Sequence, residues 1–145
     1  MDINKYKEDF IVMAEAGFIA VSQADEDSAV KLFKAAMLLE PKNLLAKVGI
    51  GYMHLCKLEL KQACKIFNEI LEEDPQHEMA KTFLGISMSL SPTDLAKGEQ
   101  ILEESARTSE DPHVKTLAHT AIDFVEKFVK KTPSPAQSPK PKERK

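Results

Sequence analysis

The side chains that could perform catalysis or bind a metal are few in this sequence, and their spacing supports neither role. The four histidines are His54, His77, His113 and His119. None belongs to a His-Glu-x-x-His pair, which places two imidazoles on one helical face to bind zinc. His113 and His119 are six residues apart and do not share a helical face closely. The sequence also has no glycine-rich phosphate loop and no nucleophile elbow. We therefore expect no enzymatic activity, no bound metal and no cofactor.

The other reactive groups have structural explanations. Cys56 and Cys64 are expected to be small buried apolar residues in a protein of a reducing compartment. Three acidic pairs are typical of solvated helix ends, namely Glu72–Glu73, Glu103–Glu104 and Glu110–Asp111. The function must therefore follow from the elements that the chain forms and from what they bind.

A regular repeat period is the clearest pattern in the chain. Gly17, Gly51 and Gly85 are equally spaced and are three of only five glycines. The same interval separates residues of three further types, namely Ala29 and Ala63, Phe33 and Phe67, and Pro41 and Pro75. Tetratricopeptide repeats, each made of a helix, a turn and a second helix, have this period of about 34 residues. Four residue types that recur in phase at this interval are their signature.

The period assigns a structural role to each recurring residue. The glycine lies inside the first helix of a repeat, where it costs about 1 kcal/mol relative to alanine. We expect this cost to be accepted because the second helix approaches closely, with Ala29 or Ala63 at the contact and Phe33 or Phe67 filling the space below. The prolines stop the second helices. In the third repeat the turn is one residue longer, so that Gly98 and Leu102 take the alanine and phenylalanine roles.

The sequence therefore predicts an all-α fold of three tetratricopeptide repeats in a right-handed superhelix, followed by a capping helix. The first helices of the repeats are predicted over 4–23, 43–57 and 77–90, and the second helices over 25–39, 60–73 and 93–107. The capping helix is predicted over 113–131, where apolar residues recur at helical spacing. The repeat domain with its cap spans residues 1–131, and residues 132–145 are predicted to be a disordered, basic tail rich in Pro, Ser and Lys.

The charge pattern and the hydropathy pattern limit the kind of partner. The net charge of the whole chain is −3, with +6 on residues 127–145 and −9 on the remainder. An acidic body argues against nucleic acid as the partner. No apolar run is long enough to insert into a membrane, and no signal peptide is visible, so we expect a cytoplasmic protein.

In tetratricopeptide proteins the first helices line a concave groove, and most residues at the matching positions here are apolar or aromatic. The predicted groove consists of Ile11, Phe18, Val21, Leu45, Tyr52, Leu55, Met79, Phe83, Ile86 and Leu90. An apolar stripe of this kind suits an amphipathic helix of a partner. Repeat proteins that hold the C-terminal carboxylate of a heat-shock protein use Lys, Asn and Arg, and those residues are missing from the groove.

A short, acidic, three-repeat chain with an apolar groove resembles the tetratricopeptide chaperones of bacterial type III secretion. The segment 106–114, in which an acidic turn and Pro112 lead into the final helix, is similar to the needle-subunit chaperones. Translocator chaperones carry a longer helical segment before the first repeat, whereas nine residues precede it here. The resemblance implies that the groove buries a helix of a small secreted needle subunit and keeps that subunit monomeric.

The same resemblance implies a second partner, a small helical co-chaperone. Val12 and Ile19 stand where later repeats pack on a preceding helix, and Tyr6 is close to them in sequence. We expect these three residues to form the edge that binds the co-chaperone. Three alternatives stay open, namely a translocator-class chaperone, a general tetratricopeptide scaffold and a self-associating module.

Overall fold

The computed structural model describes residues 2–131, and within them the chain is entirely helical, without a strand. The predicted tail, residues 132–145, lies outside the described residues. The seven α-helices of the described part are α1 (Asp9–Ser22), α2 (Glu26–Leu39), α3 (Leu45–Cys56), α4 (Leu60–Glu73), α5 (Glu78–Ser89), α6 (Leu95–Thr108) and α7 (Pro112–Phe124). A short 3₁₀-helix, η1 (Ile3–Tyr6), precedes them, and a π-helical segment, η2 (Val125–Val129), follows α7.

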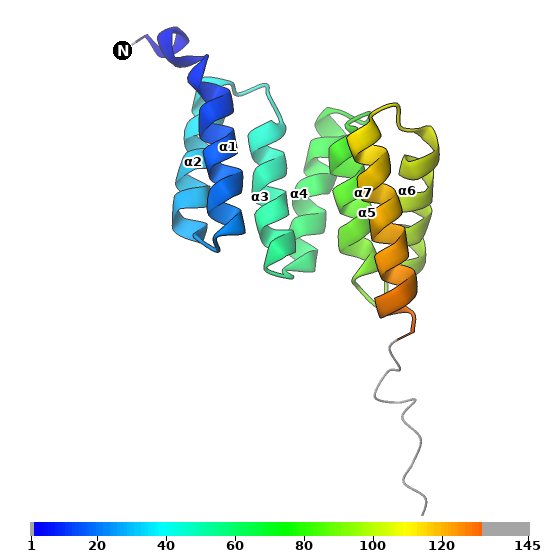
Figure 1. Ribbon diagram of the computed structural model, residues 1–145. Coiled ribbons are helices and arrows are strands. Elements are labelled where there is room, and N and C mark those ends of the chain that lie inside the picture. The colour runs from blue at the N-terminus through cyan, green and yellow to red at the C-terminus, as the bar shows by residue number, and fades with distance from the viewer. Residues whose placement is uncertain (1, 132–145) are drawn as a thin grey trace, which may run out of the picture.

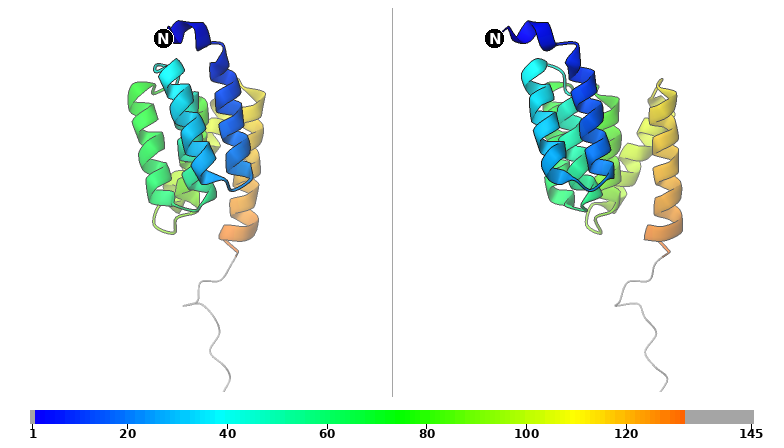
Figure 2. Two further views of the ribbon diagram at one scale, coloured as in Figure 1. Left: turned by 90° about the vertical axis from the view of Figure 1, so that its left-hand side faces the viewer. Right: turned by 60° about the vertical axis from the view of Figure 1, so that its left-hand side comes forward.

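The helices form three antiparallel pairs that follow one another across the molecule, from α1 and α2 to α5 and α6 (Figure 1). The second helix of each pair also packs on the helix that follows it, so that α2 contacts α3, α4 contacts α5 and α6 contacts α7. The left view of Figure 2 looks along the row, and there α1 and α7 lie on one side while α4 lies on the other. The helix α7 therefore joins the layer of first helices.

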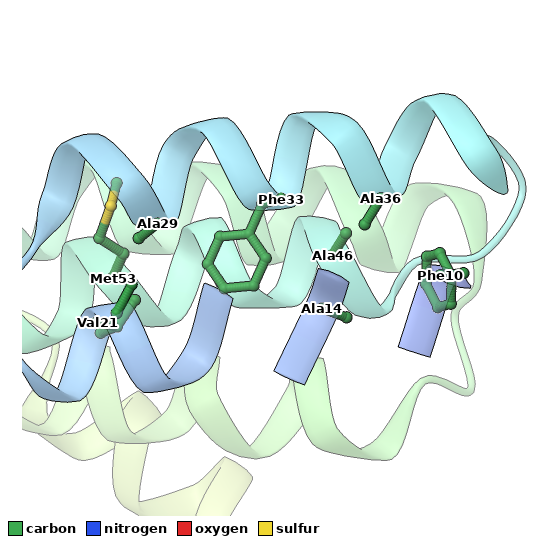
Figure 3. Close-up of a cluster of buried hydrophobic side chains, with 9 residues drawn as sticks. Phe10, Ala14, Val21, Ala29, Phe33, Ala36, Ala46 and Met53 are labelled. Atoms are coloured by element: carbon green, nitrogen blue, oxygen red, sulfur yellow. The ribbon is translucent and has the colours of Figure 1, made fainter. Parts of the chain in front are cut away.

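The close approach predicted from the glycines is confirmed. A Cβ added at Gly17 would lie 2.6 Å from Cε1 of Phe33, and one at Gly51 would lie 2.6 Å from Cε1 of Phe67. Figure 3 shows the Phe33 ring directed from α2 into the core, with Ala29 and Ala36 on the same helix. The repeat period in the sequence thus corresponds to one recurring contact between paired helices.

The turns inside the first two pairs share an unusual backbone conformation. Ala24 and Leu58, which stand one repeat period apart, both have positive φ angles, of 58° and 57°. The next residue in this series is Pro92, whose ring holds φ at about −65° and excludes the left-handed conformation. The third turn must therefore be built differently, and α6 begins at Leu95, one residue later than the period places it relative to α4.

Two predicted helices are interrupted in the structure. The helix predicted over 4–23 is divided into η1 and α1, because the backbone bonds around Lys7 are of the i to i+3 type. The helix predicted over 113–131 becomes π-helical after Phe124, where the Lys130 N–H donates to the carbonyl of Val125 at 3.0 Å. The Lys130 ammonium also pairs with Glu99 of α6, which ties this widened turn to the neighbouring helix.

Candidate functional site

A continuous row of five aromatic rings crosses the first two helix pairs and reaches α5. Its three central members belong to first helices, and the ring centroids are 5.9 Å apart for Phe18 and Tyr52 and 5.3 Å apart for Tyr52 and Phe83. At the two ends, Phe18 packs edge-on against Phe33 at 5.2 Å, and Phe83 stacks on Phe67 at 5.7 Å. Adjacent rings in these geometries attract one another by about 0.5–1.5 kcal/mol beyond the effect of burial.

Burial divides the five rings into two groups. Phe33 and Phe67, which come from second helices, are completely buried. Phe18, Tyr52 and Phe83 are only partly buried, although they pack on the buried pair and on one another. The row therefore presents three rings to the surface on a base that the core holds in place, as expected of a preformed binding surface.

The other predicted groove residues divide in the same way. Leu45, Met79, Ile86 and Leu90 are partly buried, and Ile11 is exposed. Val21 and Leu55 are each only 8% exposed and belong to the two hydrophobic clusters of the core. Figure 3 shows Val21 beside Met53 of α3. These two residues contribute packing and leave almost no surface for a partner.

Helix α7, which is predicted only as a cap, adds further apolar residues beside α5. A cavity of about 250 Å³ lies between α5 and α7 and is lined by Ile86, Leu90, Leu117, Thr120, Ala121, Phe124 and Val125. Beside it the rings of Phe124 and Phe128 are 5.1 Å apart, and these side chains are 49% and 60% exposed. The signal for this role was present in the sequence, because Leu117 and Phe124 follow Phe83 and Leu90 by one repeat period.

The polar groups close to the aromatic row are few. A hydrogen bond between the side chains of Tyr52 and Cys56 raises the pKa of the tyrosine, and burial adds to this shift. Cys56 is exposed at the end of α3, contrary to the expectation that both cysteines are buried. Cys64 is partly buried, and this burial raises the pKa of its thiol, with a further contribution from the negative charge of Asp94.

The N-terminal edge of the molecule carries the residues predicted to bind a second protein. The side chains of Val12 and Ile19 on α1 are 62% and 57% exposed, and Tyr6 of η1 is also exposed. Their counterparts at steps of one repeat period are buried, namely Ala46, Ala80 and Val114 for Val12, and Met53 and Ser87 for Ile19, except that the last counterpart of Ile19, Ala121, is partly buried. In α3, α5 and α7 the preceding helix packs against these positions. On α1 the same positions stay exposed and form an apolar strip.

Outside the aromatic row, ion pairs join helices both between pairs and within a pair. The Lys57 ammonium lies 2.8 Å from Glu26 in the first pair and 2.7 Å from Glu59 in the second. Hydrogen bonds with Lys57 and then with His54 lower the pKa of Glu59. Lys81 pairs with Glu104 at 2.5 Å between α5 and α6. All these charged groups are partly exposed, so each ion pair adds only a small amount to the stability of the fold. Its main effect is to fix how the two helices are aligned along their length.

The histidines have local roles in the described structure. Nδ1 of His54 lies 2.5 Å from Oε2 of Glu59. Nδ1 of His77 accepts a hydrogen bond from the Ala80 N–H at the start of α5. Among residues 2–131, no group of three or more His, Cys, Asp or Glu side chains is arranged to hold a metal ion. In the same range, no helix combines the length and the apolar character needed to cross a membrane.

Comparison with protein-family models, with curated proteins and with solved structures finds no match to this chain.

Proposed function

We propose that the three helix pairs are tetratricopeptide repeats stacked in a right-handed superhelix, with α7 as the final helix of the array. The proposal is supported by the repeat period and by the recurrence of the same glycine–phenylalanine contact in the first two pairs. The matching left-handed turns at Ala24 and Leu58 also support it. A repeat array of this kind contacts partners through an extended surface on one side.

We further propose that the protein is a cytoplasmic chaperone of type III secretion, of the needle-subunit class. Its groove would bury the apolar face of an amphipathic helix of a small secreted subunit that otherwise aggregates. The observation that carries this proposal is the row of partly exposed rings, Phe18, Tyr52 and Phe83, held on a fully buried base. Aromatic anchors on a rigid support are the usual centres of binding energy at protein interfaces. In this proposal the protein acts by binding, without catalysis, nucleic acid or membrane insertion.

A small helical co-chaperone would bind the edge formed by Tyr6, Val12 and Ile19. The later first helices bury the positions that correspond to Val12 and Ile19, so a partner helix on α1 would continue the pattern of the array. If Val12→Asp combined with Ile19→Asp left every partner bound and the chain monomeric, this part of the proposal would be wrong.

The groove is tested by isolating complexes of the tagged chain from its native host and identifying the bound proteins by mass spectrometry. Phe18→Asp and Phe83→Asp should each abolish capture of a small helical secreted protein while circular dichroism shows unchanged helicity. Leu38→Asp is a matched control, because Leu38 is an exposed apolar residue on α2, outside the aromatic row. Unchanged capture by both groove variants would refute the assignment.

The alternatives give different results in the same experiment. A translocator-class chaperone would capture a large secreted protein with apolar segments in place of a small subunit. A general scaffold that uses the acidic body or the basic residues 132–145 would capture cytosolic assemblies, and salt or deletion of that segment would weaken their binding. The needle-chaperone proposal expects the deletion to leave binding of the small subunit unchanged.

A further inference from the structure

The helix α7 occupies the position of a fourth first helix. It begins at Pro112, one repeat period after the start of α5 at Glu78. Three of its residues, Leu117, Thr120 and Phe124, follow Phe83, Ile86 and Leu90 by the same interval, and all three line the cavity against α5. The binding surface of the first helices therefore continues onto α7, across a layer of four helices.

The cavity between α5 and α7 has the size and lining of a site for one large apolar side chain. Its volume is about 250 Å³, and every residue that lines it is apolar except Thr120. A dry cavity of about 150 Å³ with a similar lining already accepts a benzene molecule. The exposed rings of Phe124 and Phe128 extend the apolar surface beyond its mouth. A leucine or phenylalanine of a partner helix would fill this space without a cost for unpaired polar groups.

Charge differs between the two ends of this surface. Glu15 on α1 is exposed. The residues that follow it at steps of one repeat period are Gly49, Phe83 and Leu117, so Glu15 takes on α1 the position that Phe83 takes on α5. At the other end, Lys127 and Lys131 are exposed; in the sequence they stand one residue before and three residues after Phe128. Among residues 2–131 neither lysine has an ion-pair partner, whereas the neighbouring Lys130 is held by Glu99 and Glu126. The surface thus has an exposed carboxylate, Glu15, at α1 and two exposed lysines without an ion-pair partner among residues 2–131 at η2, next to the exposed acids Asp123 and Glu126.

We propose that the cavity between α5 and α7 is the anchor site for one end of the partner helix, and that the charges at the two ends set its direction. The partner is an amphipathic helix with a large apolar side chain in the cavity. It has acidic groups beside Lys127 and Lys131 and a basic group beside Glu15. This inference rests on the proposed groove function and adds a specific chemistry for the occupant.

The test uses synthetic, fluorescein-labelled helical peptides, with binding measured by fluorescence anisotropy on the full chain. Four helices at a spacing of about 10 Å span about 30 Å, so a peptide of about 20 residues covers the surface. The first peptide carries an apolar face, a phenylalanine near one end, glutamates at that end and lysines at the other. A second has the charges exchanged, and in a third the phenylalanine is alanine.

The first peptide should bind, and the loss of its phenylalanine should weaken binding about tenfold or more. The exchange of charges should weaken binding several-fold at low salt, and less at high salt. Ala121→Phe, which fills the cavity, should lower affinity to the level of the third peptide. Lys127→Glu with Lys131→Glu should reverse the preference between the first two peptides.

Two matched controls lie on α7, outside the cavity. His119→Phe adds a ring at an exposed position that does not line the cavity, and Lys115→Glu reverses an exposed charge remote from η2. Both should bind the first peptide like the unchanged chain, and thermal unfolding followed by circular dichroism checks that every variant is folded.

The outcomes separate the two proposals. If Phe18→Asp abolishes binding while Ala121→Phe and the charge exchange have no effect, the groove stands and the anchor site is overturned. If no peptide binds, or if neither Phe18→Asp nor Phe83→Asp has any effect, the groove and the anchor site both fail. A concentration-dependent dimer in light scattering that Phe124→Asp dissociates would assign the cavity to a second copy of the chain and would also overturn the inference.

Discussion

The close packing of glycines against neighbouring helices predicts opposite effects for two chemically identical substitutions. Gly49→Ala would place a Cβ 2.2 Å from Cε1 and 2.3 Å from Cζ of Phe33. Gly85→Ala would place a Cβ 3.0 Å from Cγ2 of Ile101 and 3.1 Å from Cδ2 of Leu102. Both changes replace glycine inside a helix, so both gain about 1 kcal/mol of helix propensity. The difference in stability between the two variants then reports the space available at each site.

At Gly49 the ring cannot move away. Phe33 is completely buried, and a Cβ at Gly17 on α1 would also lie only 2.6 Å from Cε1 of the same ring, so little space is left around it. Overpacking of a well-filled core costs about 1–3 kcal/mol, and an overlap of this size belongs at the upper end. After subtraction of the propensity gain, Gly49→Ala should destabilise the fold by about 2 kcal/mol, and Tm should fall by roughly 5–10 °C.

At Gly85 the neighbouring atoms are Cγ2 of Ile101 at 3.0 Å and Cδ2 and Cγ of Leu102 at 3.1 Å, so the overlap is much smaller than at Gly49. A shift of a few tenths of an ångström restores ordinary contact, so the packing cost should be smaller than the propensity gain. Gly85→Ala should therefore be neutral or stabilising, by up to about 1 kcal/mol.

The assay is urea unfolding followed by circular dichroism. The urea concentrations at half unfolding are compared between variants that share the same m-value. Combining Gly49→Ala with Phe33→Leu should show a favourable coupling of about 1–2 kcal/mol, because the smaller side chain relieves the overlap. Equal midpoints for Gly49→Ala and Gly85→Ala, or a stabilised Gly49→Ala, would refute the packing argument.

Three further predictions concern single polar contacts. Cys56→Ala should lower the pKa of Tyr52 towards its usual value, measured by ultraviolet titration of the phenol, because the hydrogen bond that raises it is removed. Glu59→Gln should be less stable than the unchanged chain at neutral pH, because pairing with Lys57 lowers the pKa of Glu59 in the folded state. The difference should begin to shrink as the pH falls below about 4.3, the usual pKa of glutamate, and should be lost only below the lowered pKa of folded Glu59. Lys130→Ala should reduce amide hydrogen-exchange protection in η2 and leave that of α3 unchanged, because Lys130 joins η2 to α6.

Much of the helical framework could be predicted because its signals are local and recur. The interval between Gly17 and Gly51 and that between Phe33 and Phe67 predicted both the helix pairing and the contact that joins them. The longer third turn was also visible, since Gly98 and Leu102 follow Ala63 and Phe67 at one residue more than the repeat period. The left-handed residues themselves, Ala24 and Leu58, could not be identified because neither is a glycine.

The candidate site was less predictable, because exposure depends on packing between helices rather than on position in the repeat. Val21 and Leu55 occupy predicted groove positions, but contacts with the neighbouring helices bury them. Phe124 shows the opposite, since it belongs to the predicted capping helix, lines a cavity and is also 49% exposed. The π-helical turn in η2 depends on hydrogen bonds that no residue pattern specifies.

The aromatic row separates what holds the fold from what is offered to a partner. Phe33 and Phe67 are completely buried, and loss of such a ring from a core costs about 3–5 kcal/mol. Phe18, Tyr52 and Phe83 pack on this base yet keep part of their surface, so their exposed faces add little to folding. Three large aromatic side chains in adjacent helices, fixed in position but incompletely covered, have most to gain from an apolar partner. The same reasoning explains why the row is a better guide to binding than a single exposed apolar residue such as Leu38, because isolated exposed apolar residues are common on protein surfaces.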